Sequence, residues 1–244
     1  MNGSSMGSPA GLVLALLSAG HLLGDFVFQS RAMVEGKRKE TRWLLAHGLE
    51  LLLVHALVIL PFCPGVWTSA AVAGIVLTHV GIDALKVRVE LRFGRRLLWF
   101  ALDQALHLVV LVLAACWIAS GAVEVSSLTP RSLESLAWIV GIYAFNVNGG
   151  SAVVSAVLDG MRSSEKPLAG ARAGHLIGIL ERMAMLTLVW LGEWSALGFV
   201  LAAKSVARFK ELENRDFAEA YLVGTLTSFL VAGASGLLLR ALLR

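Results

Sequence analysis

The chain has 244 residues, of which 57% are hydrophobic and 16% are charged, and its mean hydropathy is +0.75. Soluble domains contain about 45–50% apolar residues, so the composition excludes an ordinary soluble domain and predicts an all-α, polytopic transmembrane helical bundle. The formal net charge of +4 is typical of cytoplasmic loops in such proteins, so no nucleic-acid partner is expected. Cys63 and Cys116 show no metal-type spacing.

Apolar stretches of membrane-spanning length, about 20 residues, follow one another along the chain. The expected spans are 9–30, 43–62, 68–86, 97–120, 136–159, 174–192, 195–209 and 221–242. The span 195–209 is amphipathic in its second half, so a short, tilted or re-entrant helix is an alternative there. We expect two modules: a four-helix module at 1–120 and a C-terminal helical module at 121–244.

Lysine and arginine residues are concentrated in alternate loops. The loops 31–42, 86–96 and 162–172 are basic, whereas the connections between them hold one such residue or none. The positive-inside rule then predicts that the basic loops are cytoplasmic and that the N-terminus lies outside. Arg240 and Arg244 would lie on the unexpected side, which counts against the last span or its orientation.

Histidine and aspartate residues recur inside the first four spans. A charged side chain at the centre of a membrane helix costs about 2.5–3.5 kcal/mol, so these residues require partners. Six of them form three pairs spaced four residues apart, which places both members of a pair on one face of a helix. The pairs are His21/Asp25, His79/Asp83 and Asp103/His107, and His47 lies on the remaining span.

The same residues share one depth in the membrane. Measured along the helices, the members nearest the basic loops lie within about 5–11 Å of them, and the others lie up to about a turn deeper. We therefore predict a divalent-metal site for one or two ions, with zinc favoured and manganese or iron as alternatives. Proton relay or an ion-pair network is the main alternative reading. The predicted ligands are His21, Asp25, His47, His79, Asp83, Asp103 and His107, and the residues expected to orient them are Gln29, Glu50, Lys86 and Gln104.

The leading functional hypothesis is a membrane-bound, metal-dependent hydrolase. Catalytic roles are expected for Asp25, Asp83 and Asp103, with Asp25 or Asp83 favoured as the base. A transporter for divalent cations or protons is the rival hypothesis, and a metal-stapled scaffold without turnover is the third. His55 lies away from the predicted layer and is expected to be an interhelical hydrogen-bonding residue.

Polar residues of the second half are candidates for substrate binding. The stretch FNVNGGS, containing Asn146 and Asn148, predicts either a broken helix or close small-residue packing. Arg182, next to Glu181, can hold a phosphate or carboxylate, and an ion pair with a bundle carboxylate is the alternative. Lys204 and Arg208 present a basic face suited to lipid headgroups or a substrate phosphate. The expected partners are membrane lipids and an amphiphilic or lipid-linked substrate, and a homodimer is left open.

The motifs HLLGDFVFQS, AHG, THVGIDALK and FALDQALH together resemble the bacterial membrane family labelled domain of unknown function 3307. The resemblance covers about residues 10–115, and the later segments GILER, LAAKSVARF and YLVGTLTS resemble the C-terminal half often attached to it. The resemblance implies a multi-pass protein of the bacterial cytoplasmic membrane. It implies no activity, although the histidine–aspartate helices are similar in style to membrane-bound metal-dependent hydrolases.

Overall fold

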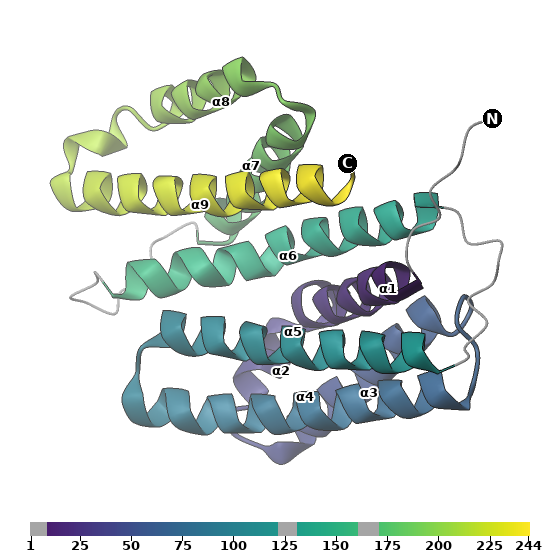
Figure 1. Cartoon of the computed structure of the whole chain (residues 1–244). Coiled ribbons are helices and arrows are strands. Elements are labelled where there is room, and N and C mark those ends of the chain that lie inside the picture. Colours follow the sequence, from purple (N-terminus) through teal and green to yellow (C-terminus); the bar gives the residue numbers. More distant parts are fainter. Residues whose placement is uncertain (1–8, 122–130, 161–170) are drawn as a thin grey trace, which may run out of the picture. The chain divides into compact units, whose positions relative to one another are not determined.

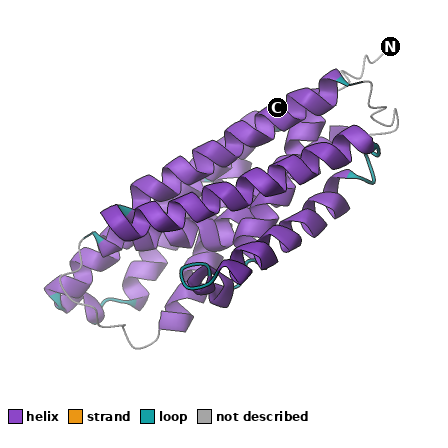
Figure 2. Ribbon diagram, turned by 90° about the horizontal axis from the view of Figure 1, so that it is seen from below, coloured by secondary structure: helices purple, strands orange, loops and turns teal. Residues whose placement is uncertain are grey.

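The computed structural model describes residues 9–121, 131–160 and 171–244, and all regular structure in these ranges is helical (Figure 2). Seven of the described helices are long and apolar enough to cross a membrane. The predicted all-α polytopic bundle is therefore confirmed. The predicted span 195–209 corresponds to a 14-residue helix, Trp194–Ala207, which is about 21 Å long and shorter than a hydrocarbon core of about 30 Å.

Two compact units divide the chain between Ala144 and Phe145, and we describe each by itself (Figure 1). The first contains α1 (Pro9–Leu23), the π-helical segment η1 (Gly24–Phe28), α2 (Arg31–Gly36), α3 (Thr41–Ile59), α4 (Val66–Phe93), α5 (Arg96–Ser120) and the first part of α6 (Arg131–Asp159). The second contains the remainder of α6, α7 (Ala171–Leu191), α8 (Trp194–Ala207), η2 (Glu211–Glu213) and α9 (Arg215–Leu242). The modules predicted at 1–120 and 121–244 stay a prediction.

The long helices of the first unit close into a four-helix ring. Helix α1 contacts α3 and α5, and α4 contacts the same two helices from the other side. The short connections from α3 to α4 and from α4 to α5 make these neighbours antiparallel. Consequently the start of α1, the end of α3, the start of α4 and the end of α5 all lie at one end of the ring.

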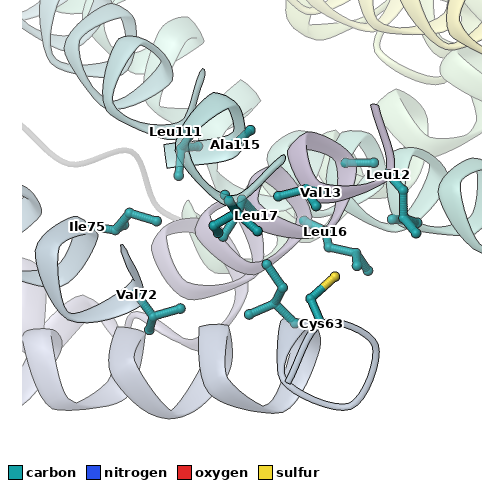
Figure 3. Packing of buried hydrophobic residues seen from close by; sticks show 14 residues of the cluster. Leu12, Val13, Leu16, Leu17, Cys63, Val72, Ile75, Leu111 and Ala115 are labelled. Carbon is teal, nitrogen blue, oxygen red and sulfur yellow. The ribbon is translucent and has the colours of Figure 1, made fainter. Parts of the chain in front are cut away.

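That end of the ring holds the apolar core, whose packing is shown in Figure 3. Five helices (α1, α3, α4, α5 and the first part of α6) and the turn after α3 contribute to it; the members include Leu12, Val13, Leu16, Leu17, Ile59, Cys63, Val72, Ile75, Leu111, Ala115, Ile118 and Ala137. Cys63 is a free thiol, and burial raises its pKa, so it packs as a neutral, apolar side chain. The predicted histidine–aspartate layer occupies the opposite end of the four-helix ring.

Helix boundaries differ from the predicted spans where charged residues follow an apolar run. Helix α4 continues to Phe93, so Lys86, Arg88 and Arg92 are helical rather than part of a loop. Hydropathy marks the end of the membrane-buried stretch, whereas lysine, arginine and glutamate are good helix formers that extend the helix beyond it. Helix α9 likewise starts at Arg215, because the Asn214 side chain accepts a hydrogen bond from the Phe217 N–H. Most of the basic loop predicted at 162–172 lies outside the described residues.

Close packing of α7 against α9 in the second unit gives the first prediction. A Cβ at Gly236 would lie 2.8 Å from the Leu186 carbonyl oxygen and 2.7 Å from Val189 Cβ, whereas a Cβ at Gly233 meets nothing within 4 Å. Because a backbone atom cannot move aside cheaply, Gly236→Ala is expected to destabilise the protein by about 1–3 kcal/mol. The matched control Gly233→Ala should leave it unchanged or slightly more stable. Thermal unfolding in detergent micelles checks this, and equal melting temperatures for the two variants would contradict the packing.

Candidate metal centre

The seven predicted ligands are brought together inside the four-helix ring, at the end opposite the apolar core. Helix α1 with η1, α3, α4 and α5 each contribute at least one of them. Their side chains are at most 9% exposed. Donor atoms form three overlapping groups in which all atoms lie within 4.8 Å of one another. The groups are His21, Asp25, His79 and His107; His47, His79 and Asp83; and Asp83, Asp103 and His107.

Three donor atoms form a nearly equilateral triangle. Asp25 Oδ1 lies 3.1 Å from His47 Nε2 and 3.3 Å from His79 Nε2, and the two Nε2 atoms are 3.2 Å apart. Ligands that hold a tetrahedral zinc ion at about 2.0–2.1 Å are separated by about 3.3–3.4 Å, so the triangle has the size of one face of such a site. We call these three residues the ligand triangle.

Local backbone features set up the ligand triangle. Asp25 lies in the π-helical segment η1, where the Gln29 N–H donates to the Gly24 carbonyl at 3.0 Å; π-turns of this kind are frequent at functional sites. Helices α3 and α4 approach closely next to His47, because Gly48 has no side chain and a Cβ there would lie 2.8 Å from Val80 Cγ2. The three ligands therefore meet while α3 and α4 keep regular α-helical geometry, and the departure from that geometry is confined to η1.

Groups expected to orient the ligands lie around His47. The Gln29 amide nitrogen is 3.1 Å from His47 Nδ1, and the nearer oxygen of Glu50 is 3.7 Å from the same nitrogen. Both residues are thus placed where the sequence predicted supporting groups. His55 lies outside the cluster, as predicted, but its Nδ1 hydrogen-bonds the Leu51 carbonyl of its own helix α3 at 2.9 Å, whereas the sequence predicts an interhelical bond.

Asp83 lies beside the ligand triangle and is held by a lysine that the sequence analysis did not single out. Its Oδ2 is 3.6 Å from His79 Nε2 and 3.8 Å from His47 Nε2. The Lys37 ammonium group hydrogen-bonds this oxygen. Lys37 follows α2, and Gly36 before it packs against the indole of Trp43. In the sequence Lys37 is one of several cations in a basic loop, and nothing there sets it apart from the others. It differs from them because α2 is folded so that Lys37 reaches Asp83.

Three further ligands of the cluster carry buried polar atoms without hydrogen-bond partners among the described residues. Asp103 Oδ2 accepts hydrogen bonds from Lys86 at 2.8 Å and from Gln104 at 3.0 Å. Among the described residues, Asp103 Oδ1 and both ring nitrogens of His21 and of His107 have no hydrogen-bond partner. Buried polar groups are nearly always paired, so these atoms fit a site that receives ligands or ions.

The charges of the cluster are unbalanced. Asp25, Asp83, Asp103 and Glu50 supply carboxylates, whereas the ammonium groups in contact with them are those of Lys37 and Lys86. With neutral imidazoles, the carboxylates exceed the ammonium groups by two. Uncompensated buried charge costs several kcal/mol per ion, and one divalent cation would offset this excess. The donor set, the size of the ligand triangle and the charge therefore all fit a divalent metal ion.

Arg182, a predicted substrate-binding residue in the second unit, contacts helix α6. It is 3% exposed, and its guanidinium donates to the carbonyls of Asn146 at 3.0 Å and Val147 at 3.1 Å and to Ser151 Oγ at 2.5 Å. None of these acceptors is a carboxylate. The absence of a side chain at Gly150 makes room, because a Cβ there would lie 2.7 Å from Arg182 Nε. The alternative of a broken helix at FNVNGGS is wrong, because α6 runs through it unbroken.

The remaining predicted substrate-binding residues do not gather at one point. Lys204 forms an ion pair with Glu181, and Arg208 lies 3.1 Å from Glu211 on the exposed surface. The Asn146 amide donates to Ser235 Oγ at 2.9 Å, and Asn148 is half-buried on α6. A role for these side chains in substrate binding stays a prediction.

The fold and the cluster define a polytopic helical membrane protein with a buried histidine–aspartate centre in its N-terminal four-helix ring. The chain belongs to the family described as "Protein of unknown function (DUF3307)", which matches residues 12–133. The predicted family membership is thus confirmed, and the matched region contains all seven cluster residues. No curated protein and no solved structure matches the chain.

The contacts of Arg182 give a second prediction. Arg182→Gln removes charge-assisted hydrogen bonds from a buried position and is expected to destabilise the protein by about 2–4 kcal/mol. The matched control Arg208→Gln removes an exposed ion pair and should change stability by less than about 1 kcal/mol. Thermal unfolding in micelles checks both. An Arg182→Gln variant as stable as the parent would show that the guanidinium does not hold α6 and α7 together.

Proposed function

We propose that the chain is a membrane-bound, metal-dependent hydrolase whose ion is held by Asp25, His47 and His79. The observation that carries the proposal is the ligand triangle, with edges of 3.1–3.3 Å. Structural zinc sites use four protein ligands, whereas catalytic sites use three and leave a position for water or substrate. Two imidazoles and one carboxylate also suit manganese or iron, and zinc is favoured.

The side chains around the ligand triangle suit hydrolysis. A divalent ion bound there supplies a Lewis acid and a water of lowered pKa. Asp83 lies 3.6 Å from His79 Nε2 and is the base that accepts the proton of the attacking water. Lys37 hydrogen-bonds Asp83 and fixes its position. The enclosing helices keep bulk water out of the reaction.

The proposed substrate is a lipid or lipid-linked phosphate. Seven membrane-length helices favour an amphiphilic molecule, and two ammonium groups, those of Lys37 and Lys86, lie at the cluster, where each pairs with an aspartate. The basic loops that border this end of the ring support a location at the cytoplasmic leaflet of a bacterial inner membrane, with the N-terminus outside. Arg182 and Lys204 support this substrate less than the sequence alone indicates, because both are engaged within the second unit.

Metal analysis of the purified protein tests the proposal. The parent should hold a stoichiometric divalent metal and hydrolyse a lipid phosphate in mixed micelles. Asp25→Asn and His79→Ala should lose the metal and at least about a hundredfold in rate. The matched control is His55→Ala, which alters a buried histidine outside the cluster and should retain both properties. A parent without stoichiometric metal would refute the proposal, and metal-dependent cation flux without hydrolysis would favour the transporter.

The ion pair of Lys37 gives a further prediction. Lys37→Gln removes a positive charge next to the ligand triangle and frees Asp83 to face the ion. Zinc affinity, measured by competition with a chelator, is therefore expected to rise by about tenfold or more. Lys39→Gln is the matched control, since Lys39 is an exposed cation of the same segment, and its affinity should change little. Weaker binding by Lys37→Gln would mean that the ammonium group supports the site rather than competing with the ion.

A further inference from the structure

Polar atoms that lack partners among the described residues belong to cluster side chains outside the ligand triangle. Both nitrogens of His21, both nitrogens of His107 and Oδ1 of Asp103 are buried without hydrogen-bond partners among the described residues. The side chains are 2–5% exposed. Each unpaired group costs about 1–3 kcal/mol, and none of these atoms is one of the three donor atoms of the ligand triangle.

Asp25 connects these atoms with the ligand triangle. Its Oδ1 belongs to the triangle, whereas its Oδ2 faces His21 Nε2 at 3.9 Å. A carboxylate with one oxygen toward each of two donor sets has the arrangement of a bridging ligand. His79 of the triangle and His107 of the second set are also adjacent, with stacked rings whose centroids are 3.9 Å apart at an interplanar angle of 17°.

We infer that His21, Asp103 and His107, with Asp25 as the bridging carboxylate, bind a second divalent metal ion. The inference rests on the proposed ion in the ligand triangle and makes the centre dinuclear. Asp103 Oδ1 is free to coordinate, since Lys86 and Gln104 occupy Oδ2 only, and it lies 3.9 Å from His107 Nδ1. The mixture of imidazole and carboxylate suits zinc or manganese.

The second ion specifies the class of substrate. One divalent ion offsets the two excess carboxylates of the cluster, so a second ion adds two positive charges that need anions in contact with them. A phosphate ester supplies that charge, and sites with two metals stabilise both the attacking and the leaving oxygen of a phosphoryl centre. Phosphate should accordingly strengthen the binding of the second ion.

Metal stoichiometry tests the inference on the full-length protein in neutral detergent. The protein is stripped with a chelator, titrated with Mn²⁺, and analysed for bound metal with and without inorganic phosphate. We expect two ions per chain in the parent and in the control His55→Ala, and one in His107→Ala and in Asp103→Asn. Phosphate should lower the dissociation constant of the second ion by at least about tenfold in the parent and in the control His55→Ala, and it should have no such effect in His107→Ala and Asp103→Asn.

The possible outcomes separate this inference from the proposed function. One ion in the parent, with no change in either variant, overturns the second site and leaves the ligand triangle intact. Two ions in parent and variants alike also overturn it, because the second ion would then lie elsewhere. No bound metal overturns both proposals. Should the variants fail to fold, the electron paramagnetic resonance spectrum of the Mn²⁺-loaded parent decides: exchange coupling, expected for ions about 3.5–4 Å apart, supports the pair, and a spectrum of isolated Mn²⁺ overturns it.

Discussion

Burial of carboxylates in an apolar helical ring is the constraint on which the rest of the first unit depends. Asp25, Asp83 and Asp103 lie among helices whose outer surfaces face hydrocarbon, where an unpaired charge is costly. Lys37 and Lys86 each pair with one of these aspartates, whereas the partners of Asp25 in the described part of the chain are imidazoles. Asp25, the aspartate without an ammonium partner among the described residues, is therefore the one around which the proposed ion binds, and both proposed ligand sets share it.

The two ends of the four-helix ring differ in composition: one is apolar and closely packed, and the other holds the polar cluster. One end is packed with leucine, isoleucine, valine and alanine around Leu17, Ile59 and Ile118, all of which are fully buried. The other end holds the polar cluster, where unpaired atoms weaken the fold locally. A well-packed apolar end can offset such a cost, because burying one large aliphatic side chain contributes about 1.5–3 kcal/mol.

The second unit uses buried charge in a different way. Arg182 is directed at the backbone of α6, and Gly150 and Ser151 shape the surface that receives it. A guanidinium with several donors in a fixed plane suits this task better than an ammonium group. Buried polar residues of the two units thus differ in their partners: Arg182 contacts the backbone of a neighbouring helix, whereas the cluster of the first unit brings imidazoles and carboxylates together.

Sequence patterns alone predict the helical class, the family, seven of the eight expected spans as membrane-length helices, and the polar residues that the structure gathers in one cluster. Hydropathy, four-residue spacing and loop charge are local properties of the sequence. In a regular helix they determine which face of the helix a residue lies on and how deep it lies in the membrane. Only the tertiary structure decided which atoms meet: the ligand triangle, the pairing of Lys37 with Asp83, the π-turn at Asp25 and the contacts of Arg182. These depend on how closely helices approach and on how a loop folds back, which are set by packing between residues far apart in the chain.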